Sequence, residues 1–281
     1  MRIVLDFLRL IRVSNGLLTA IGVWVGAYLT WNDPIYYGPM IASLSAFLVC
    51  SFGNCVNDML DMEIDRVNRP DRVLVRGVLS TRIALIVALL CGLGAMIAAV
   101  AVNWEVTVTV AVAIMLLVVY NFKLKRVPLA GNIVIAILGG LTFVTGGLAV
   151  NPSWTFEFPG PLIPAVFAVL LHLVREILKD VEDIAGDRAV GITTFPQVVG
   201  IRSALVTAIG FFVVLVILTM VPVLFGWFGD AYKIIAVYIV DLPLLALLIM
   251  VWGNPSPRML TFGSLGLKVG MALGIIALMV A

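Results

Sequence analysis

Two short acidic segments stand out in a chain that is otherwise mostly apolar. The first is FGNCVNDMLDMEIDRVNRP at residues 52–70, and the second is REILKDVEDIAGDR at residues 175–188. In both, an amide or carboxylate is followed by carboxylates at the same intervals. These residues are Asn54, Asp58, Asp61 and Asp65 in the first segment and Glu176, Asp180, Asp183 and Asp187 in the second. A spacing that recurs in this way indicates one chemical task performed by two segments.

Helical geometry places the first set on a single face. At about 100° per residue, Asn54, Asp58, Asp61 and Asp65 fall within an arc of roughly 60°. Carboxylates this close repel one another unless a cation lies between them, and an oxygen-bound cation such as Mg²⁺ is the usual solution. The alternative interpretation is a solvated, acidic helix end.

Basic residues near both segments extend this chemistry toward phosphate. Arg69, Arg72, Lys125 and Lys179 are the candidate donors. Two acidic helix ends that oppose each other across a cavity, with metal ions between them and basic donors beside them, suit a diphosphate leaving group. Because Cys and His clusters are missing from the sequence, the ligand set favours Mg²⁺ over zinc or copper, with Mn²⁺ as an alternative.

Composition identifies the elements that must position these groups. Of 281 residues, 62% are hydrophobic and 12% charged, and the mean hydropathy is +1.16, values typical of an integral membrane protein. We expect no nucleic-acid partner. Apolar runs of about 20 residues, the length that crosses a bilayer, predict nine transmembrane helices. They are 14–31, 39–56, 82–102, 104–122, 131–150, 161–178, 203–226, 233–252 and 262–281.

The distribution of basic residues predicts the orientation in the membrane. Arginines and lysines are concentrated before the first span and after the second, fourth and sixth, whereas the connections on the other side contain only Lys233. By the positive-inside rule, the N-terminus and both acidic segments face the cytoplasm of a multi-pass protein of the cell membrane.

The expected fold is therefore all-α: one domain over residues 1–281, with nine membrane helices around a central cavity. Polar cap loops at about 58–81, 123–130 and 179–202 would lie on the cytoplasmic face. Because the acidic spacing follows the second span and again the sixth, it also predicts an internal repeat of four helices.

Two segments make a family resemblance specific. NDMLDMEID at 57–65 resembles the NDxxDxxxD motif of the UbiA-type intramembrane prenyltransferases, and KDVEDIAGD at 179–187 resembles their second acidic motif. The NRP at 68–70, the LK at 124–125 and the LAGN at 129–132 resemble further segments of that family. One departure is VLVR at 73–76, where relatives often have a PxPSG sequence.

The resemblance implies a Mg²⁺-dependent prenyltransferase and assigns roles to residues. One Mg²⁺ would be held by Asn57, Asp58, Asp61 and Asp65, and a second by Asp180, Asp183 and Asp187, with a prenyl diphosphate bridging both. Asn57 lies about 100° from Asp58 on a regular helix, so its participation requires a distorted helix end. The expected catalytic residues are Asp61, Asp183, Lys125 and Tyr120. Further candidates for binding the diphosphate or an acceptor phosphate are Asn54, Arg69, Arg72, Lys123, Lys179 and Asp241.

The acceptor is a separate question. REILKDVEDIAGD resembles the archaeal branch of the family, which implies transfer of a geranylgeranyl group from geranylgeranyl diphosphate to geranylgeranylglyceryl phosphate, forming digeranylgeranylglyceryl phosphate. Basic cytoplasmic residues fit this phosphorylated, lipid-like acceptor, and they equally fit the positive-inside rule. The alternative is prenylation of an aromatic or quinone precursor.

A different class, a membrane transporter, would also explain repeated halves and intramembrane acids. Transporter sites lie near the midplane, whereas these acids lie at helix ends. Asp241 is the exception, because it falls inside a predicted span, where an ionisable group is costly. It either faces the acceptor chamber or accepts hydrogen bonds from a neighbouring helix.

Overall fold

Helices form almost all of the structure, a computed structural model that describes residues 2–30 and 37–281. No strand occurs in this part of the chain. A helix satisfies its own backbone hydrogen bonds, which lipid cannot do, so long apolar runs become helices. The all-α prediction is confirmed for these residues. The predicted end of the first span at Trp31 and the connection at 31–36 lie outside the described residues.

The elements follow the predicted order. The α-helices are α1 (Arg2–Leu10), α2 (Val13–Thr30), α3 (Tyr37–Leu60), α4 (Met62–Asn68), α5 (Thr81–Val100), α6 (Trp104–Phe122), α7 (Ala130–Val150), α8 (Leu162–Ala189), α9 (Phe195–Val199), α10 (Ile201–Leu224), α11 (Asp230–Lys233), α12 (Leu242–Gly253) and α13 (Pro257–Met279). A short 3-10 helix, η1 (Leu124–Arg126), follows α6, and a π-helical stretch, η2 (Ile234–Asp241), joins α11 to α12.

Eight helical segments of the described chain are long and apolar enough to cross a membrane. Helix α8 occupies the place of the predicted sixth span but is not among the eight, because its second half is rich in charged residues. The multi-pass character is therefore established, and the nine-helix count stays a prediction.

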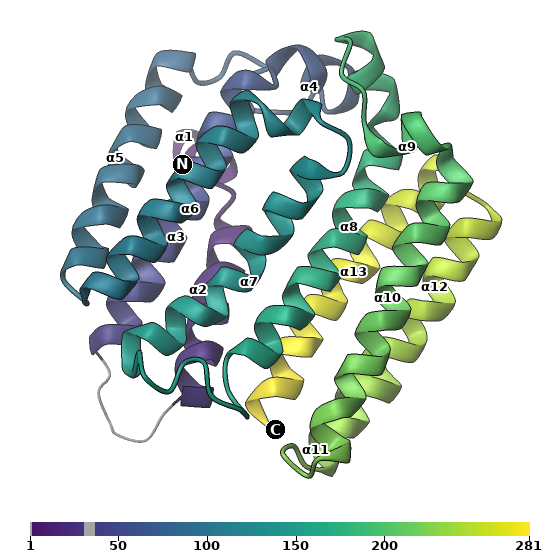
Figure 1. Cartoon of the computed structure of the whole chain (residues 1–281). Coiled ribbons are helices and arrows are strands. Elements are labelled where there is room, and N and C mark those ends of the chain that lie inside the picture. Colours follow the sequence, from purple (N-terminus) through teal and green to yellow (C-terminus); the bar gives the residue numbers. More distant parts are fainter. Residues whose placement is uncertain (1, 31–36) are drawn as a thin grey trace.

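The long helices surround a central space. Helix α2 contacts α3, α7 and α13, while α8 contacts α7, α10 and α13. In Figure 1, α5, α6 and α3 form one side of the bundle and α10 and α12 the other, with α7 and α8 between them. The short elements α4 and α9 lie at one end, and α11 lies at the opposite end.

Small residues allow α2 and α7 to pack closely. A Cβ atom at Gly146 would lie 1.9 Å from the carbonyl oxygen of Val23, and one at Gly26 would lie 1.9 Å from that of Phe143. Neither position can accept a larger residue without moving the helices apart. This contact brings α2, and the residues just before it, against the wall of the central space.

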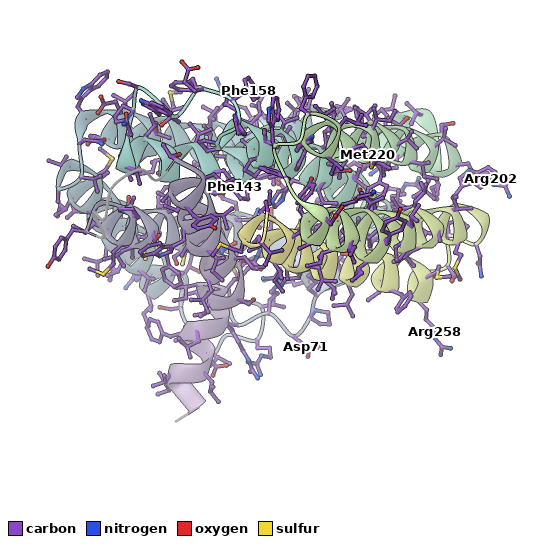
Figure 2. All side chains as sticks on the ribbon, turned by 90° about the horizontal axis from the view of Figure 1, so that it is seen from below. Asp71, Phe143, Phe158, Arg202, Met220 and Arg258 are labelled. Atoms are coloured by element: carbon purple, nitrogen blue, oxygen red, sulfur yellow. The ribbon has the colours of Figure 1, made fainter. Side chains whose placement is uncertain are left out.

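The outer surface is apolar, as a lipid-facing surface must be. Leu89, Leu90 and Leu93 on α5 are each more than 60% exposed. Helix α1 projects from the bundle (Figure 2) and exposes Ile3 and Val4. An exposed helix with apolar residues on one face and basic residues on another is typical of a membrane interface.

Candidate active site

Two adjoining cavities share one wall. The smaller, of about 60 Å³, is the polar pocket; the larger, of about 1200 Å³, is the chamber. The residues that line both are Asn57, Arg69, Arg72, Tyr120, Glu176 and Lys179. Most of the chamber lies between α2, α3, α7, α8 and α13, so it extends from the polar end into the membrane-spanning part of the bundle.

Both acidic segments contribute to the polar pocket. The contributing residues are Asn57, Asp61 and Asp65 from the first segment and Glu176, Asp180, Asp183 and Asp187 from the second. The predicted opposition of two acidic helix ends across a cavity is thus present in the structure. The backbone of the two segments differs at this pocket.

The first segment is kinked at Asp61. Helix α3 ends at Leu60, Asp61 has φ −96° and ψ 9°, and α4 begins at the next residue. The amide of Asp61 still donates to the Asn57 carbonyl at 2.9 Å, and that of Asp65 to the Asp61 carbonyl at 2.8 Å. Asn57, Asp61 and Asp65 therefore follow one another by single turns along the polar pocket, as a distorted helix end allows.

The prediction of a single face shared by Asn54, Asp58, Asp61 and Asp65 is correct only in part. Asn54 and Asp58 line the chamber and do not reach the polar pocket. Asn54 donates to the backbone carbonyl of Ile11 at 3.2 Å. Asn57, one residue before Asp58, takes its place beside Asp61 and Asp65 in the polar pocket.

Asp58 is held by two arginines. Its side chain is 2% exposed; it pairs with Arg12 and lies 3.2 Å from Arg72 Nη1. Arg12 joins α1 to α2 with a φ of 50°, a left-handed conformation that is uncommon for a residue with a side chain. Such strain persists where surrounding contacts fix it, and the pair with Asp58 is one such contact.

Ion pairs also occupy the two principal carboxylates of the polar pocket. Lys125, on η1, pairs with Asp61. Arg69 donates through Nη2 to both carboxylate oxygens of Asp183, at 2.9 and 3.1 Å. Acidic and basic groups therefore converge where a diphosphate and its counter-ions would meet.

Asparagines fix the second segment in place. Asn68 donates to the Asp183 carbonyl at 3.0 Å and accepts from the Gly186 amide at 3.0 Å, which ties the end of α4 to α8. Asn132, on α7, donates to Asp180 Oδ2 at 2.9 Å. Sequence reasoning found the segments that contain Asn68 and Asn132 but assigned these two residues no role.

Burial disfavours the ionised form of two carboxylates of the pocket, Asp65 and Asp187. The pKa of Asp187 rises to about 6, mainly through burial and then through the neighbouring charge of Asp183. Burial also raises the pKa of Asp65, and Arg72 only partly opposes the shift. Both shifts are those of carboxylates that await a positive partner.

The donor set suits a divalent cation bound by oxygen. Carboxylates and an amide surround the pocket, which is the ligand chemistry of Mg²⁺. Within residues 2–30 and 37–281, no three acidic, His or Cys side chains converge closely enough to hold a metal ion as they stand. Asp61 and Asp183 would have to turn from Lys125 and Arg69 toward the cation.

The remaining predicted residues divide between the site and its surroundings. Tyr120 lines both cavities, and Lys179 Nζ lies 3.6 Å from Glu176 Oε2. Asp241 lines the chamber, is 2% exposed and accepts a 2.6 Å hydrogen bond from Thr219 on α10, so it meets both expectations. Lys123 is exposed and lines neither cavity, because α6 has already ended there, so its role in binding phosphate stays a prediction.

Comparison with known proteins now identifies the chain. A model of the UbiA prenyltransferase family matches residues 17–278. The chain belongs to this family. It is therefore a membrane-embedded prenyltransferase, and the two acidic segments with their basic partners form its candidate active site.

Relatives and solved structures agree with this assignment. The chain is 36% identical to digeranylgeranylglyceryl phosphate synthase from Thermococcus sibiricus over 95% of this chain and 92% of that protein. It is also 36% identical to the enzyme of that name from Methanopyrus kandleri, over 96% and 97%. A solved structure of a digeranylgeranylglyceryl phosphate synthase superposes with a TM-score of 0.75 at 28% identity, covering 100% of this chain and 98% of that one. A UbiA homologue from Archaeoglobus fulgidus bound to GPP and Mg²⁺ has the same fold, with a TM-score of 0.65 at 20% identity over 98% and 100% of the two chains.

Proposed function

We propose that the enzyme transfers a geranylgeranyl group from geranylgeranyl diphosphate to geranylgeranylglyceryl phosphate, forming digeranylgeranylglyceryl phosphate in a Mg²⁺-dependent reaction. The observation that carries this proposal is the pairing of the two cavities: a pocket of acids and bases adjoins a chamber of about 1200 Å³. A charged head group and long hydrocarbon tails need those two environments side by side. The names of the relatives from Thermococcus and Methanopyrus favour this acceptor.

The polar pocket would take the diphosphate. Arg69, Lys125 and Lys179 line it and would donate to the phosphate oxygens, with Arg72 at the wall shared with the chamber. Charge-assisted hydrogen bonds of this kind stabilise the negative charge that develops on a departing diphosphate.

The cation sites would use the oxygen donors on either side of the pocket. Asn57, Asp61 and Asp65 would hold one Mg²⁺, and Asp180, Asp183 and Asp187 a second, with Mn²⁺ as a possible substitute. When bound, the ions neutralise the charge of the diphosphate leaving group. The ion pairs of Asp58 favour a supporting role for this residue, because Arg12 and Arg72 already hold its carboxylate.

The residues of the enzyme position the two substrates and exclude water from the reaction. The bond between the allylic carbon and the diphosphate oxygen breaks, and the free hydroxyl oxygen of the acceptor forms the new ether bond and loses its proton. Tyr120 stands at the wall between the two cavities, where the reacting carbon would lie. The apolar side chains that line much of the chamber would keep water from the allylic carbon, which water would otherwise attack.

The orientation that we propose keeps the acidic segments on the cytoplasmic face of the cell membrane, as charge asymmetry predicts. The polar pocket lies among α4, η1 and the end of α8, and α4 lies at the end of the bundle remote from α11 (Figure 1). Helix α8 would then serve as the ninth membrane helix, with its charged half at the cytoplasmic end.

An acceptor panel tests the proposal. The purified protein in detergent is supplied with Mg²⁺, geranylgeranyl diphosphate and, in turn, geranylgeranylglyceryl phosphate, 4-hydroxybenzoate or a naphthoate. We expect prenylated product with the glyceryl phosphate acceptor, and loss of turnover with EDTA that returns with Mg²⁺. Product from an aromatic acceptor alone would replace this function with the runner-up, and no product from any acceptor would refute both.

A further inference from the structure

One lysine lies midway along a membrane-spanning helix without a carboxylate partner. Lys268 is on α13, and its side chain lines the chamber. Its Nζ donates to Asn15 Oδ1 at 3.2 Å, and no acidic group of the described residues pairs with it. An ionisable side chain at this depth is costly and marks a functional site by default.

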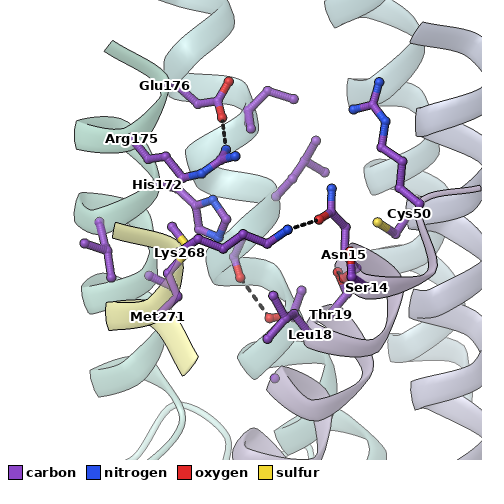
Figure 3. Close-up of a pocket in the computed structure, with 18 of the residues that line it drawn as sticks. Ser14, Asn15, Leu18, Thr19, Cys50, His172, Arg175, Glu176, Lys268 and Met271 are labelled. Carbon is purple, nitrogen blue, oxygen red and sulfur yellow. Dashed lines mark hydrogen bonds and ion pairs between the residues drawn. The ribbon is translucent and has the colours of Figure 1, made fainter. Parts of the chain in front are cut away.

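Two arginines extend this positive region. Arg175 on α8 and Arg12, the residue before α2, line the same chamber as Lys268. Figure 3 shows Lys268 reaching from α13 toward Asn15 on α2, with Arg175 approaching from α8. The Nε atom of Arg12 is buried and has no hydrogen-bond partner. Like charges that share one cavity repel, so an anion bound between them would stabilise this arrangement.

The nearest carboxylates do not fill that role. Glu176 lies 2.8 Å from Arg175 Nη1 and 3.6 Å from Lys179, so two bases already share it. Asp58 is likewise shared by Arg12 and Arg72.

The other acids that line the chamber are engaged or exposed. Asp241 accepts from Thr219, Glu182 accepts from Thr261 at 2.7 Å, and Asp71 is exposed to solvent. None of these three pairs with Lys268, Arg175 or Arg12. The positive charge inside the chamber therefore remains in excess.

We propose that Lys268, together with Asn15 and Arg175, binds the phosphate monoester of the acceptor lipid. This inference rests on the proposed function and names the part of the site that recognises the acceptor. In geranylgeranylglyceryl phosphate the free hydroxyl is on the carbon next to the one that bears the phosphate, so the phosphate must bind near the reacting carbon. Arg175 precedes Glu176, which lies on the wall shared with the polar pocket, so the cluster borders that place.

The test compares two acceptors that differ only in the phosphate: geranylgeranylglyceryl phosphate and geranylgeranylglycerol. Lys268→Met removes the charge and keeps the length of the side chain. We expect kcat/KM for the phosphorylated acceptor to fall about 10- to 100-fold, the usual effect of losing a charged hydrogen bond. We expect little change for geranylgeranylglycerol and in the KM of geranylgeranyl diphosphate.

Two control variants distinguish the loss of the Lys268 charge from a general effect on folding. Lys268→Arg keeps the charge and should retain most of the phosphate preference. Lys233→Met makes the same substitution on α11, at a position that lines neither cavity, and should behave as the unmodified enzyme. A preference for phosphate that survives in Lys268→Met would overturn the inference. A raised KM for geranylgeranyl diphosphate instead would assign the cluster to the donor.

A binding measurement keeps this inference distinct from the proposed function. With neither Mg²⁺ nor diphosphate present, geranylgeranylglyceryl phosphate should raise the melting temperature of the unmodified protein and of Lys268→Arg, but not of Lys268→Met. That pattern would support the phosphate site even if no acceptor were turned over. Equal shifts in all three proteins would refute it even if turnover were normal.

Discussion

The two acidic segments have the same spacing in sequence and different shapes in space. The second segment lies on one uninterrupted helix, α8, and its four equally spaced acids, Glu176, Asp180, Asp183 and Asp187, all line the polar pocket. The first segment crosses the kink at Asp61, and of its four corresponding positions only Asp61 and Asp65 line that pocket. The difference shows that equal spacing does not by itself make two segments equivalent.

The two segments differ because their corresponding aspartates have different side-chain partners. Asp58 and Asp180 occupy the same place in the spacing, yet Asp58 pairs with Arg12 and Arg72, while Asp180 accepts a hydrogen bond from Asn132. A carboxylate between two guanidiniums is a structural tie. A carboxylate with a neutral amide beside it keeps free lone pairs that can bind a cation.

The predicted four-helix repeat therefore gains no support from the site itself. The recurrence of spacing stays a prediction about ancestry, and the geometry assigns the two segments unequal tasks. Four experiments test that inequality.

The largest effect is expected where the segments agree. Asp61 and Asp183 both line the polar pocket and both hold a basic partner, Lys125 or Arg69. Asp61→Asn and Asp183→Asn should each lower turnover by at least about 100-fold, since each removes the negative charge and one carboxylate oxygen from the proposed cation sites. Product formation at saturating Mg²⁺ measures this effect. Activity close to normal in either variant would remove that segment from the chemistry.

The second prediction compares the loss of stability and activity on substitution of Asp58 and of Asp180. Asp58→Asn leaves Arg12 and Arg72 without their carboxylate, and should cost about 2 to 4 kcal/mol of stability, somewhat below the range for fully buried pairs because both arginines are partly exposed. Asp180→Asn should cost much less stability and more activity. Thermal unfolding in detergent, measured beside turnover, separates the two. If both variants lose activity equally and remain stable, the segments are equivalent after all.

The last positions of the two segments, Asp65 and Asp187, should respond to pH in the same direction. The pKa of Asp187 rises from 3.8 to about 6 on burial, so its ionised form is disfavoured in the fold. Its contribution to stability is complete below pH 3.8 and is lost as the pH rises through about 6. In EDTA, the melting temperature should therefore fall between pH 5 and pH 7.5, and Mg²⁺ should restore it.

Two variants control that measurement. Asp187→Asn should flatten the pH dependence in EDTA, because the group that ionises is gone. Glu63→Gln alters an exposed carboxylate on α4 that pairs with Arg66 and should leave the dependence unchanged. A melting temperature that rises toward pH 7.5 in EDTA would contradict the assignment.

Sequence reasoning succeeded where the information was local. Apolar runs located the helices, and the acidic spacing located the residues of the polar pocket. It missed contacts between distant positions: Arg12 meets Asp58 across 46 residues, and Lys268 meets Asn15 across 253. The argument from spacing assumed a regular helix through Asp61, whereas the family resemblance required a distorted helix end. Spacing alone could not predict the kink, because it does not contain the packing of α4 against α8.

The smallest effect is expected from the hydrogen bonds by which Asn68 joins the end of α4 to α8. The Asn68 side chain bonds to the backbone of Asp183 and Gly186, and a Cβ atom at Gly186 would lie 2.3 Å from Asn68 Nδ2. Asn68→Ala and Gly186→Ala therefore break one contact from opposite sides. Each should lower kcat by about 3- to 10-fold through misplacement of the pocket and cost roughly 1 to 2 kcal/mol of stability.

The double variant shows whether Asn68 and Gly186 act through the same contact. Because both substitutions remove the same contact, the double variant should resemble either single variant, so that the effects are not additive. Fully additive losses would mean that each residue acts separately. Two independent contacts would then position the kinked segment, and the loss of kcat in the double variant should equal the product of the two single losses.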